Sequence, residues 1–190
     1  MNLPRVLEFA RMILQTSVNI GDIVVDATIG NGHDTLFLAK LIGQTGHVYG
    51  FDIQEAAIIQ TNLRLNRDNL SERTTLFQRG HEQLLAMIPE HDQRKITGAI
   101  LNLGYLPKGD KSIVTNPDTT ISAVEQLLTV MSKGGTIVLV VYSGHPQGAE
   151  ERDVLLQYVK DLEQEKAHVL QYGFINQRNS PPFIIAIEKK

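Results

Sequence analysis

Two carboxylates that follow short apolar runs are the residues most able to do chemistry in this sequence. Asp26 ends a run that begins at Ile23 and precedes the turn Gly30–Gly32, and Asp52 ends a second apolar run twenty residues after that turn. Glycine permits left-handed backbone angles and close approach of a ligand. A helix that begins after such a turn offers free N–H groups, and an acid at the next strand end is expected to bind a ribose diol. The two carboxylates are therefore expected to share one nucleotide-binding site.

Departures from the dinucleotide fingerprint indicate which nucleotide-like cofactor this site takes. The dinucleotide pattern ends in a third Gly or Ala, where this chain has Thr35. Asp26 would also place a negative charge beside a pyrophosphate, which is unfavourable in a partly desolvated turn. S-adenosylmethionine instead offers ammonium and sulfonium cations to that acid and a ribose diol to Asp52. The segment therefore resembles the first two motifs of class I methyltransferases; a dehydrogenase and a purely structural turn are the alternatives.

Polar residues also follow the next two predicted strands, at the sheet edge where open α/β sheets bind ligands. His81 and Glu82 follow the third strand, and His81 is expected either to contact the purine or to cap the next helix. Asn102 and Tyr105 follow the fourth strand, in a partial match to the Asn-Pro-Pro-Tyr motif of amino-methylating enzymes. A side-chain carbonyl there can hold a free amine with its lone pair in line with the methyl group. Tyr105 is either a stacking platform for a base or an ordinary packed tyrosine.

Further candidates lie after the fifth predicted strand and in two polar loops. Tyr142 and His145 follow that strand and could face the acceptor, with His145 as a candidate general base. The loop residues are candidates for contacts to a base or phosphate, or are simply solvated and turn-forming: Lys108, Asn176, Arg178 and Asn179. The histidines show no metal-ligand spacing, so no metal is expected.

The composition indicates an ordinary globular protein. The chain has 190 residues, no cysteine, a net charge of −3 and a pI near 6.1. One domain spanning 1–190 is expected, and disulfides and thiol catalysis are excluded. An RNA partner must meet a local basic patch, since the overall charge repels phosphate. No stretch reaches membrane-spanning length, so a cytoplasmic location is expected by default.

Strand-like and helix-like patterns alternate along the chain, which predicts a parallel sheet with helices on both faces. Strands are expected at 23–25, 48–52, 74–78, 96–103, 136–142, 167–175 and 183–188. The last two must pair antiparallel, because the segment between them is too short for a crossover helix. Apolar helical stripes are formed by Val6, Ala10, Ile13 and Leu14; Ile59 and Leu63; Ile121, Val124, Leu127, Leu128 and Met131; and Val154, Tyr158 and Leu162. This pattern resembles the seven-stranded class I methyltransferase sheet.

Together, these segments resemble over nearly the whole chain a small bacterial family labelled as ribosomal RNA methylases. The resemblance rests on segments 26–35, 49–54, 80–82, 102–107, 142–146 and 176–182. It implies that the cofactor is held by Asp26, Gly30, Asn31, Gly32, Asp34, Asp52, Gln54 and His81, with Glu82 beside them. It also implies that Asn102, Tyr105, Tyr142, His145 and the final hairpin face the acceptor.

The resemblance further implies a substrate, since members of the family methylate transfer RNA. They transfer methyl from S-adenosylmethionine to 5-aminomethyl-2-thiouridine at the wobble position, so the anticodon region of transfer RNA is the expected partner. An amine acceptor agrees with the interpretation of Asn102. The alternatives are a ribosomal RNA methyltransferase, a small-molecule N-methyltransferase and a cofactor-binding module without activity. A homodimer is also compatible with the sequence.

Overall fold

The sheet that carries these segments has seven strands in the order β3-β2-β1-β4-β5-β7-β6. The computed structural model describes residues 2–104, 114–144 and 146–190. The strands are β1 (Ile23–Asp26), β2 (His47–Phe51), β3 (Thr74–Phe77), β4 (Ile96–Leu103), β5 (Thr136–Val141), β6 (Ala167–Tyr172) and β7 (Phe183–Lys189). The predicted class I methyltransferase sheet is thus confirmed, although the strand expected at 167–175 ends at Tyr172.

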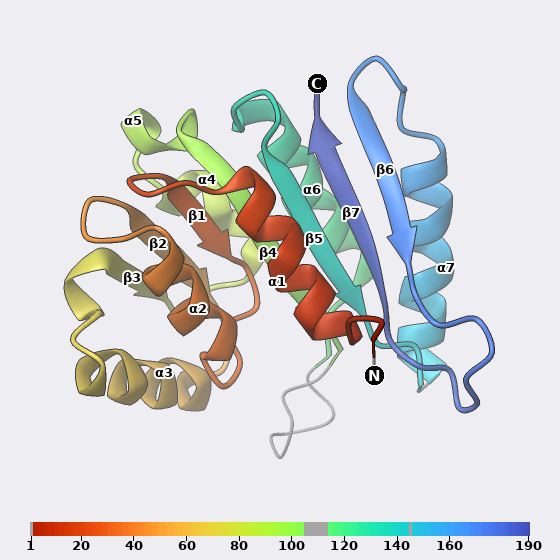
Figure 1. Cartoon of the computed structure of the whole chain (residues 1–190), viewed down its shortest axis with the longest axis horizontal. Coiled ribbons are helices and arrows are strands. Elements are labelled where there is room, and N and C mark those ends of the chain that lie inside the picture. Colours follow the sequence, from red (N-terminus) through yellow and green to blue (C-terminus); the bar gives the residue numbers. More distant parts are fainter. Residues whose placement is uncertain (1, 105–113, 145) are drawn as a thin grey trace.

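Strand directions follow the expected pattern. The pairs β1–β2, β1–β4, β2–β3 and β4–β5 are parallel, whereas β7 pairs antiparallel with both β5 and β6. The carboxyl ends of the five parallel strands therefore meet at one edge of the sheet, the lower edge in Figure 1. Ligands in open α/β sheets bind beyond this edge.

Helices cover both faces of the sheet (Figure 1). One face packs against α1 (Val6–Ser17), α2 (His33–Leu41) and α3 (Glu55–Arg67), and the other against α4 (Leu84–Met87), α6 (Pro117–Val130) and α7 (Pro146–Lys160). Three short helices complete the connections: η1 (Ser71–Arg73), η2 (His81–Gln83) and α5 (Glu90–Gln93). Among the described residues, no helix has the length and apolar character needed to cross a membrane.

The central position of β5 explains its sequence. All six residues of this strand, Thr-Ile-Val-Leu-Val-Val, are buried, because helices cover both sides of the sheet. Helix α6 starts sharply, since Asn116 caps it by accepting a hydrogen bond from the Asp118 N–H and Pro117 occupies its first turn. The apolar stripe predicted for this helix packs into the core, with Val124 and Leu127 fully buried.

Helix α3 forms where it was predicted, but the residues named for its apolar stripe point outward. Ile59 and Leu63 are 54% and 61% exposed, whereas Ala57, Thr61 and Leu65 are buried. The Thr61 side chain lies against Gly32 of the glycine turn, so this part of the inner face carries small side chains in place of large apolar ones. Hydrophobic periodicity alone therefore predicted the helix correctly and its orientation wrongly.

Helix α7 shows a smaller deviation of the same kind. Val154 is 39% exposed, while Leu155 and Val159 are buried. Tyr158 and Leu162 are partly buried against the core, as predicted. The stripe is therefore rotated by about one residue from the predicted one.

Candidate functional site

Two adjoining cavities lie at the carboxyl ends of the parallel strands. The α1 cavity, of about 540 Å³, is lined by α1, the glycine turn, and the ends of β4 and β5. The β2 cavity, of about 350 Å³, is lined by the ends of β1 and β2, residues 79–82, and the start of α6. Both linings include Thr28, Gly30, Asn102 and Gly104. These four residues therefore form the junction between the two spaces.

The glycine turn between β1 and α2 has the left-handed geometry that its sequence requires. Gly30 and Gly32 have φ angles of 53° and 75°, and Gly32 is the N-cap of α2. A Cβ on Gly32 would collide with the Thr61 side chain on α3, lying 2.8 Å from its Cγ2 and overlapping its Oγ1. Glycine is therefore needed at position 32 both for the backbone angle and for the space.

Asp52 fastens this turn to the end of β2. Its Oδ2 accepts a hydrogen bond of 2.8 Å from the Gly30 N–H, and its Oδ1 accepts one of 2.9 Å from the Gln54 N–H. Each carboxylate oxygen can accept a second hydrogen bond. Because Asp52 and Gln54 line the β2 cavity, the carboxylate can still receive two hydroxyl groups from a bound ligand.

Asp26 lies beneath the turn and is fully buried. Its carboxylate accepts hydrogen bonds from Thr35 Oγ1 at 2.5 Å and from the Thr28 N–H at 3.3 Å. Burial, followed by the nearby charge of Asp34, raises the pKa of Asp26 to about 7. The side chain belongs to neither cavity lining. The structure thus places Asp26 beneath the turn, where its hydrogen bonds to Thr28 and Thr35 can support it.

Asn102 lies at the junction of the two cavities and is held by two hydrogen bonds. Its backbone N–H donates to Thr28 Oγ1 at 2.6 Å, and its side-chain Nδ2 donates to Asp34 Oδ2 at 3.0 Å. Asp34 forms an ion pair with Arg11 of α1 at 2.8 Å. The polar residues around the α1 cavity are therefore ordered before any ligand enters.

His81 lines the β2 cavity, and one of its ring nitrogens has no hydrogen-bond partner in the part of the chain that the structure describes. Its Nδ1 lies 3.2 Å from the Ala27 carbonyl oxygen, and since a carbonyl only accepts, Nδ1 carries the hydrogen. Nε2 is buried and has no hydrogen-bond partner among the described residues. Burial lowers the pKa of His81, which favours the neutral ring with Nε2 as an acceptor. Because the ring bonds to the end of β1, the alternative of a side-chain helix cap is wrong.

The remaining predicted cofactor and acceptor residues divide between the two cavities. Asn31, Asp34 and Tyr142 line the α1 cavity, and Glu82 lines the β2 cavity. Partial burial and the charge of Asp34 raise the pKa of Tyr142. Its hydroxyl therefore stays protonated and can donate a hydrogen bond at neutral pH.

The final hairpin contributes less to the cavities than expected. Asn176, Arg178 and Asn179 are exposed and belong to neither lining, whereas Ser180 lines the α1 cavity. Asn179 and Ser180 have φ angles of 65° and 46°, so turn formation accounts for part of this polar cluster. Three further predicted residues lie outside the described residues: Tyr105, Lys108 and His145.

Sequence reasoning missed three polar residues that shape the site. Arg11 looks like a solvated charge on an amphipathic helix, and Thr28 looks like an ordinary turn residue. Thr115 accepts a hydrogen bond of 2.9 Å from the Gly104 N–H and donates one of 2.6 Å to the carboxylate of Glu151. No pattern of spacing marks these contacts, because each joins separate elements. Among the described residues, no group of three or more metal-ligating side chains is found.

Comparisons with known proteins agree with this geometry. A family model described as "Putative rRNA methylase" matches residues 48–188. The chain is 34% identical over 191 residues to a tRNA (mnm(5)s(2)U34)-methyltransferase, chloroplastic, from Arabidopsis thaliana, covering 96% of this chain and 69% of that one. A crystal structure of a protein with the family's description, from Clostridium thermocellum, is 41% identical, with full coverage of both chains and a TM-score of 0.95.

A second similar solved structure is a complex with a ligand. It is described as "a putative methyltransferase" from Streptococcus mutans in complex with SAH, with 36% identity, 99% coverage of both chains and a TM-score of 0.89. Family match, sequence identity and fold all agree. The chain belongs to the family described as "Putative rRNA methylase" and is an S-adenosylmethionine-dependent methyltransferase of the class I fold.

Proposed function

We propose that this enzyme N-methylates the aminomethyl group of 5-aminomethyl-2-thiouridine at the wobble position of transfer RNA. The observation that carries the proposal is the junction of the two cavities at Asn102, because a methyl group must pass between a cofactor site and an acceptor site. The name of the Arabidopsis relative supports this substrate, since its similarity extends over 96% of the chain.

The β2 cavity suits the nucleoside part of the cofactor. Asp52 can accept from the ribose hydroxyls, as described above, and Nε2 of His81 can accept from an exocyclic amine. Gln54 and Glu82 complete the polar lining, and the side chain of Ile53 offers apolar surface to a base. When bound, S-adenosylmethionine supplies an electrophilic methyl group on its sulfonium sulfur.

The glycine turn is proposed to receive the cofactor's methionyl part. Gly30 lines both cavities, and Asn31 follows it on the side of the α1 cavity. Gly32 lets this turn pack tightly on α3. Asp26, protonated or ionised near neutral pH, is proposed to act from below by fixing the turn through Thr28 and Thr35.

The α1 cavity is proposed to receive the acceptor amine. Its volume of about 540 Å³ lies within the range of small-molecule sites. Asn102 would accept an N–H from the amine, and Tyr142 would border the base. The free amine attacks in line, so that a C–N bond forms as the S–C bond breaks, and one amine proton leaves to water. Orientation by the protein is the main contribution expected.

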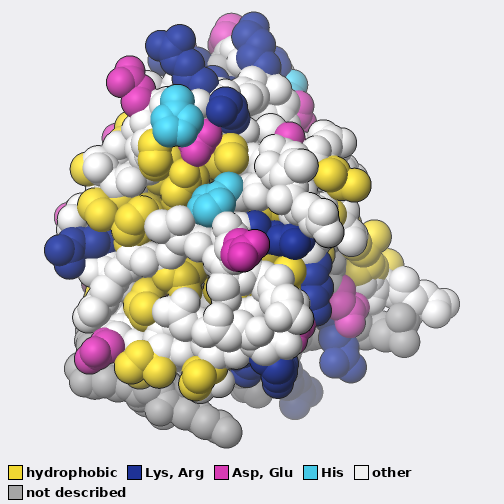
Figure 2. All heavy atoms as spheres, turned by 90° about the vertical axis from the view of Figure 1, so that its left-hand side faces the viewer, with side chains coloured by type: hydrophobic (Ala, Val, Ile, Leu, Met, Phe, Trp, Pro, Cys, Tyr) yellow, Lys and Arg dark blue, Asp and Glu magenta, His cyan; other side chains and the backbone are white. Residues whose placement is uncertain are grey.

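Because the protein has a net negative charge, an RNA acceptor has to be bound by particular groups near the site and not by the overall charge. The net charge is −3, and on the face formed by β2, β3 and α3, acidic and basic side chains are interspersed (Figure 2). No single-sign field therefore covers that face, and the contacts around the α1 cavity are expected to dominate binding. The polar hairpin residues Asn176, Arg178 and Asn179 are proposed to contact the RNA outside the cavity.

The test is a methyl-transfer assay with labelled S-adenosylmethionine and transfer RNA from cells that lack the enzyme. Nucleoside mass spectrometry should then show 5-methylaminomethyl-2-thiouridine at the wobble position. Ribosomal RNA and RNA-free reactions serve as controls. Label on ribosomal RNA alone, or on a small amine without RNA, would overturn the proposed substrate while leaving the methyltransferase assignment intact.

A further inference from the structure

The side-chain amide of Asn102 is held in one orientation by a group that can only accept. Its Nδ2 donates to Asp34 Oδ2 at 3.0 Å, and an ionised carboxylate has no hydrogen to give in return. A flipped amide would place its own oxygen against the carboxylate. The Asn102 carbonyl oxygen is therefore turned away from Asp34.

Arg11 fixes the carboxylate in turn. Its Nε and Nη2 donate to Asp34 Oδ1 at 3.0 and 2.8 Å, so the two oxygens of Asp34 serve different partners. The Arg11 guanidinium also lies 5.3 Å from the centre of the Phe37 ring on α2, within the range of a cation–π contact. Two helices thus hold one end of this chain of contacts, and β4 holds the other.

We propose that Arg11 and Asp34 are positioning residues that set the amide orientation of Asn102 for methyl transfer. In this arrangement the amide presents its carbonyl oxygen, and not its NH₂ group, to the acceptor amine. The inference rests on the proposed amine acceptor and deepens it. It also assigns Asp34 to the acceptor side of the site, in place of the cofactor contact expected from the sequence.

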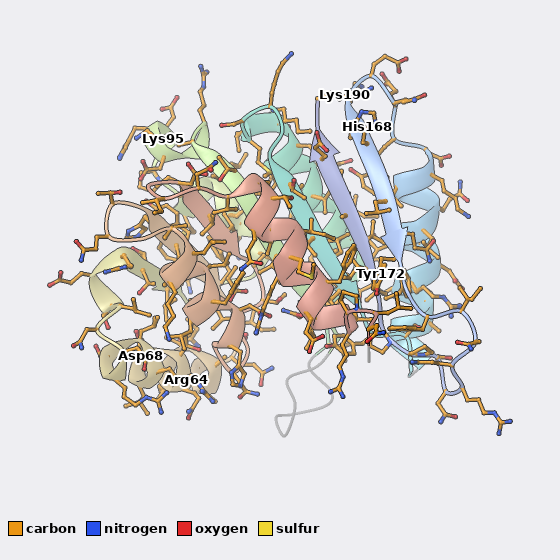
Figure 3. All side chains as sticks on the ribbon, in the orientation of Figure 1. Arg64, Asp68, Lys95, His168, Tyr172 and Lys190 are labelled. Carbon is orange, nitrogen blue, oxygen red and sulfur yellow. The ribbon has the colours of Figure 1, made fainter. Side chains whose placement is uncertain are left out.

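The decisive variant is Asp34→Asn, which keeps the shape but can both donate and accept. Because Arg11 can only donate, the new amide keeps its oxygen toward Arg11 and turns its NH₂ group toward Asn102, which favours the flipped amide of Asn102. We therefore expect kcat to fall about tenfold while the cofactor Kd stays within about twofold, the loss expected for a charge-assisted hydrogen bond. Arg11→Met should lower kcat in the same direction, and Arg11→Lys should restore part of it. Asp68→Asn is the matched control, since Asp68 at the C-terminal end of α3 is a carboxylate that accepts from Lys40 and lines neither cavity (Figure 3).

A double-mutant cycle separates positioning from a merely structural role. If Asp34 acts through Asn102, Asp34→Asn should cost nothing further in an Asn102→Ala background. Additive losses in kcat would overturn the proposal. So would a weakened cofactor Kd with unchanged kcat, which would return Asp34 to the cofactor site.

A measurement without turnover keeps this inference separate from the proposed substrate. In ¹⁵N spectra, the Asn102 NH₂ signals, identified by their loss in Asn102→Ala, should exchange slowly with water in the native enzyme and faster in Asp34→Asn and Arg11→Met. Unchanged exchange in both variants would refute the positioning role, even if transfer RNA proves not to be the acceptor. If the Asn102 NH₂ hydrogens exchange slowly in the native enzyme but that enzyme does not methylate transfer RNA, only the proposed substrate is refuted.

Discussion

The carboxylates of this site differ in their surroundings, and burial strongly shifts the pKa of Asp26. Burial raises its pKa to about 7, whereas in the unfolded chain the carboxyl group releases that proton near its ordinary pKa of 3.8. Between these values the folded state keeps a proton that the unfolded state has lost. The free energy of unfolding contributed by Asp26 therefore falls as pH rises toward 7 and is constant above it.

Asp26→Asn should remove this pH dependence, because an amide cannot ionise, yet its oxygen can still accept the hydrogen bond from Thr35 Oγ1. Urea denaturation at pH 5 and at pH 8 measures the free energy of unfolding. From pH 5 to pH 8 this free energy should fall by up to about 3 kcal/mol more in the native protein than in the variant. Other groups affect both proteins equally. Parallel pH profiles for the two proteins would show that Asp26 is ionised throughout.

Asp52 is partly buried and lines the β2 cavity. Asp52→Ala should raise the Kd for S-adenosylmethionine about tenfold or more, because it removes the proposed ribose acceptor and frees the Gly30 and Gln54 N–H groups. Calorimetric titration would measure the Kd, with Asp68→Ala, just after the C-terminal end of α3, as the control. Unchanged affinity would exclude Asp52 from the cofactor site.

At the scale of elements, the close fit between the glycine turn and α3 is what gives the site its shape. Gly32→Ala should lower stability by about 2–3 kcal/mol, because the new Cβ meets Thr61 and the φ angle of 75° is unfavourable for alanine. Adding Thr61→Ala relieves the collision but not the backbone strain. The double variant should therefore regain only part of the loss in chemical denaturation, and full recovery would contradict the strain at Gly32.

The elements differ in how well the sequence predicts them. The antiparallel end of the sheet can be predicted from one short connection, and the position of Asp52 beside a cavity can be predicted from its place at a strand end. The inner face of α3 was misjudged because Ala57 and Thr61, although buried, are not strongly hydrophobic. The Arg11–Asp34 contact was missed because it joins two separate helices on the same face of the sheet, and helical periodicity does not specify which partner a charged residue meets.

At the scale of the whole molecule, distant segments hold α1 in place over the sheet. The Tyr172 hydroxyl of β6 donates to the Pro4 carbonyl oxygen at 2.7 Å, and its ring stacks on Phe9 with centroids 3.9 Å apart. Tyr172 lies on the part of β6 nearest the N-terminal end of α1 (Figure 3). The position of Arg11 in the α1 cavity therefore depends on contacts made at the other end of the sequence.

Tyr172→Phe should lower the free energy of unfolding by about 1 kcal/mol through loss of one hydrogen bond. Tyr172→Ala also removes the stacking and should cost about 3 kcal/mol. Urea denaturation measures both. His168→Ala, on the exposed part of the same strand, should change stability by less than about 0.5 kcal/mol; equal effects of all three would show that the contact with α1 contributes nothing.

The place of β7 between β5 and β6 has a consequence for how the chain matures on the ribosome. Strand β6 is synthesised first, yet it has no neighbour in the sheet until β7 emerges. Until then β5, which is buried throughout in the finished protein, presents an open apolar edge of the kind that recruits other chains. Nascent or truncated chains that stop before β7 should therefore depend on chaperones, and insertion of this strand commits the molecule to its native form.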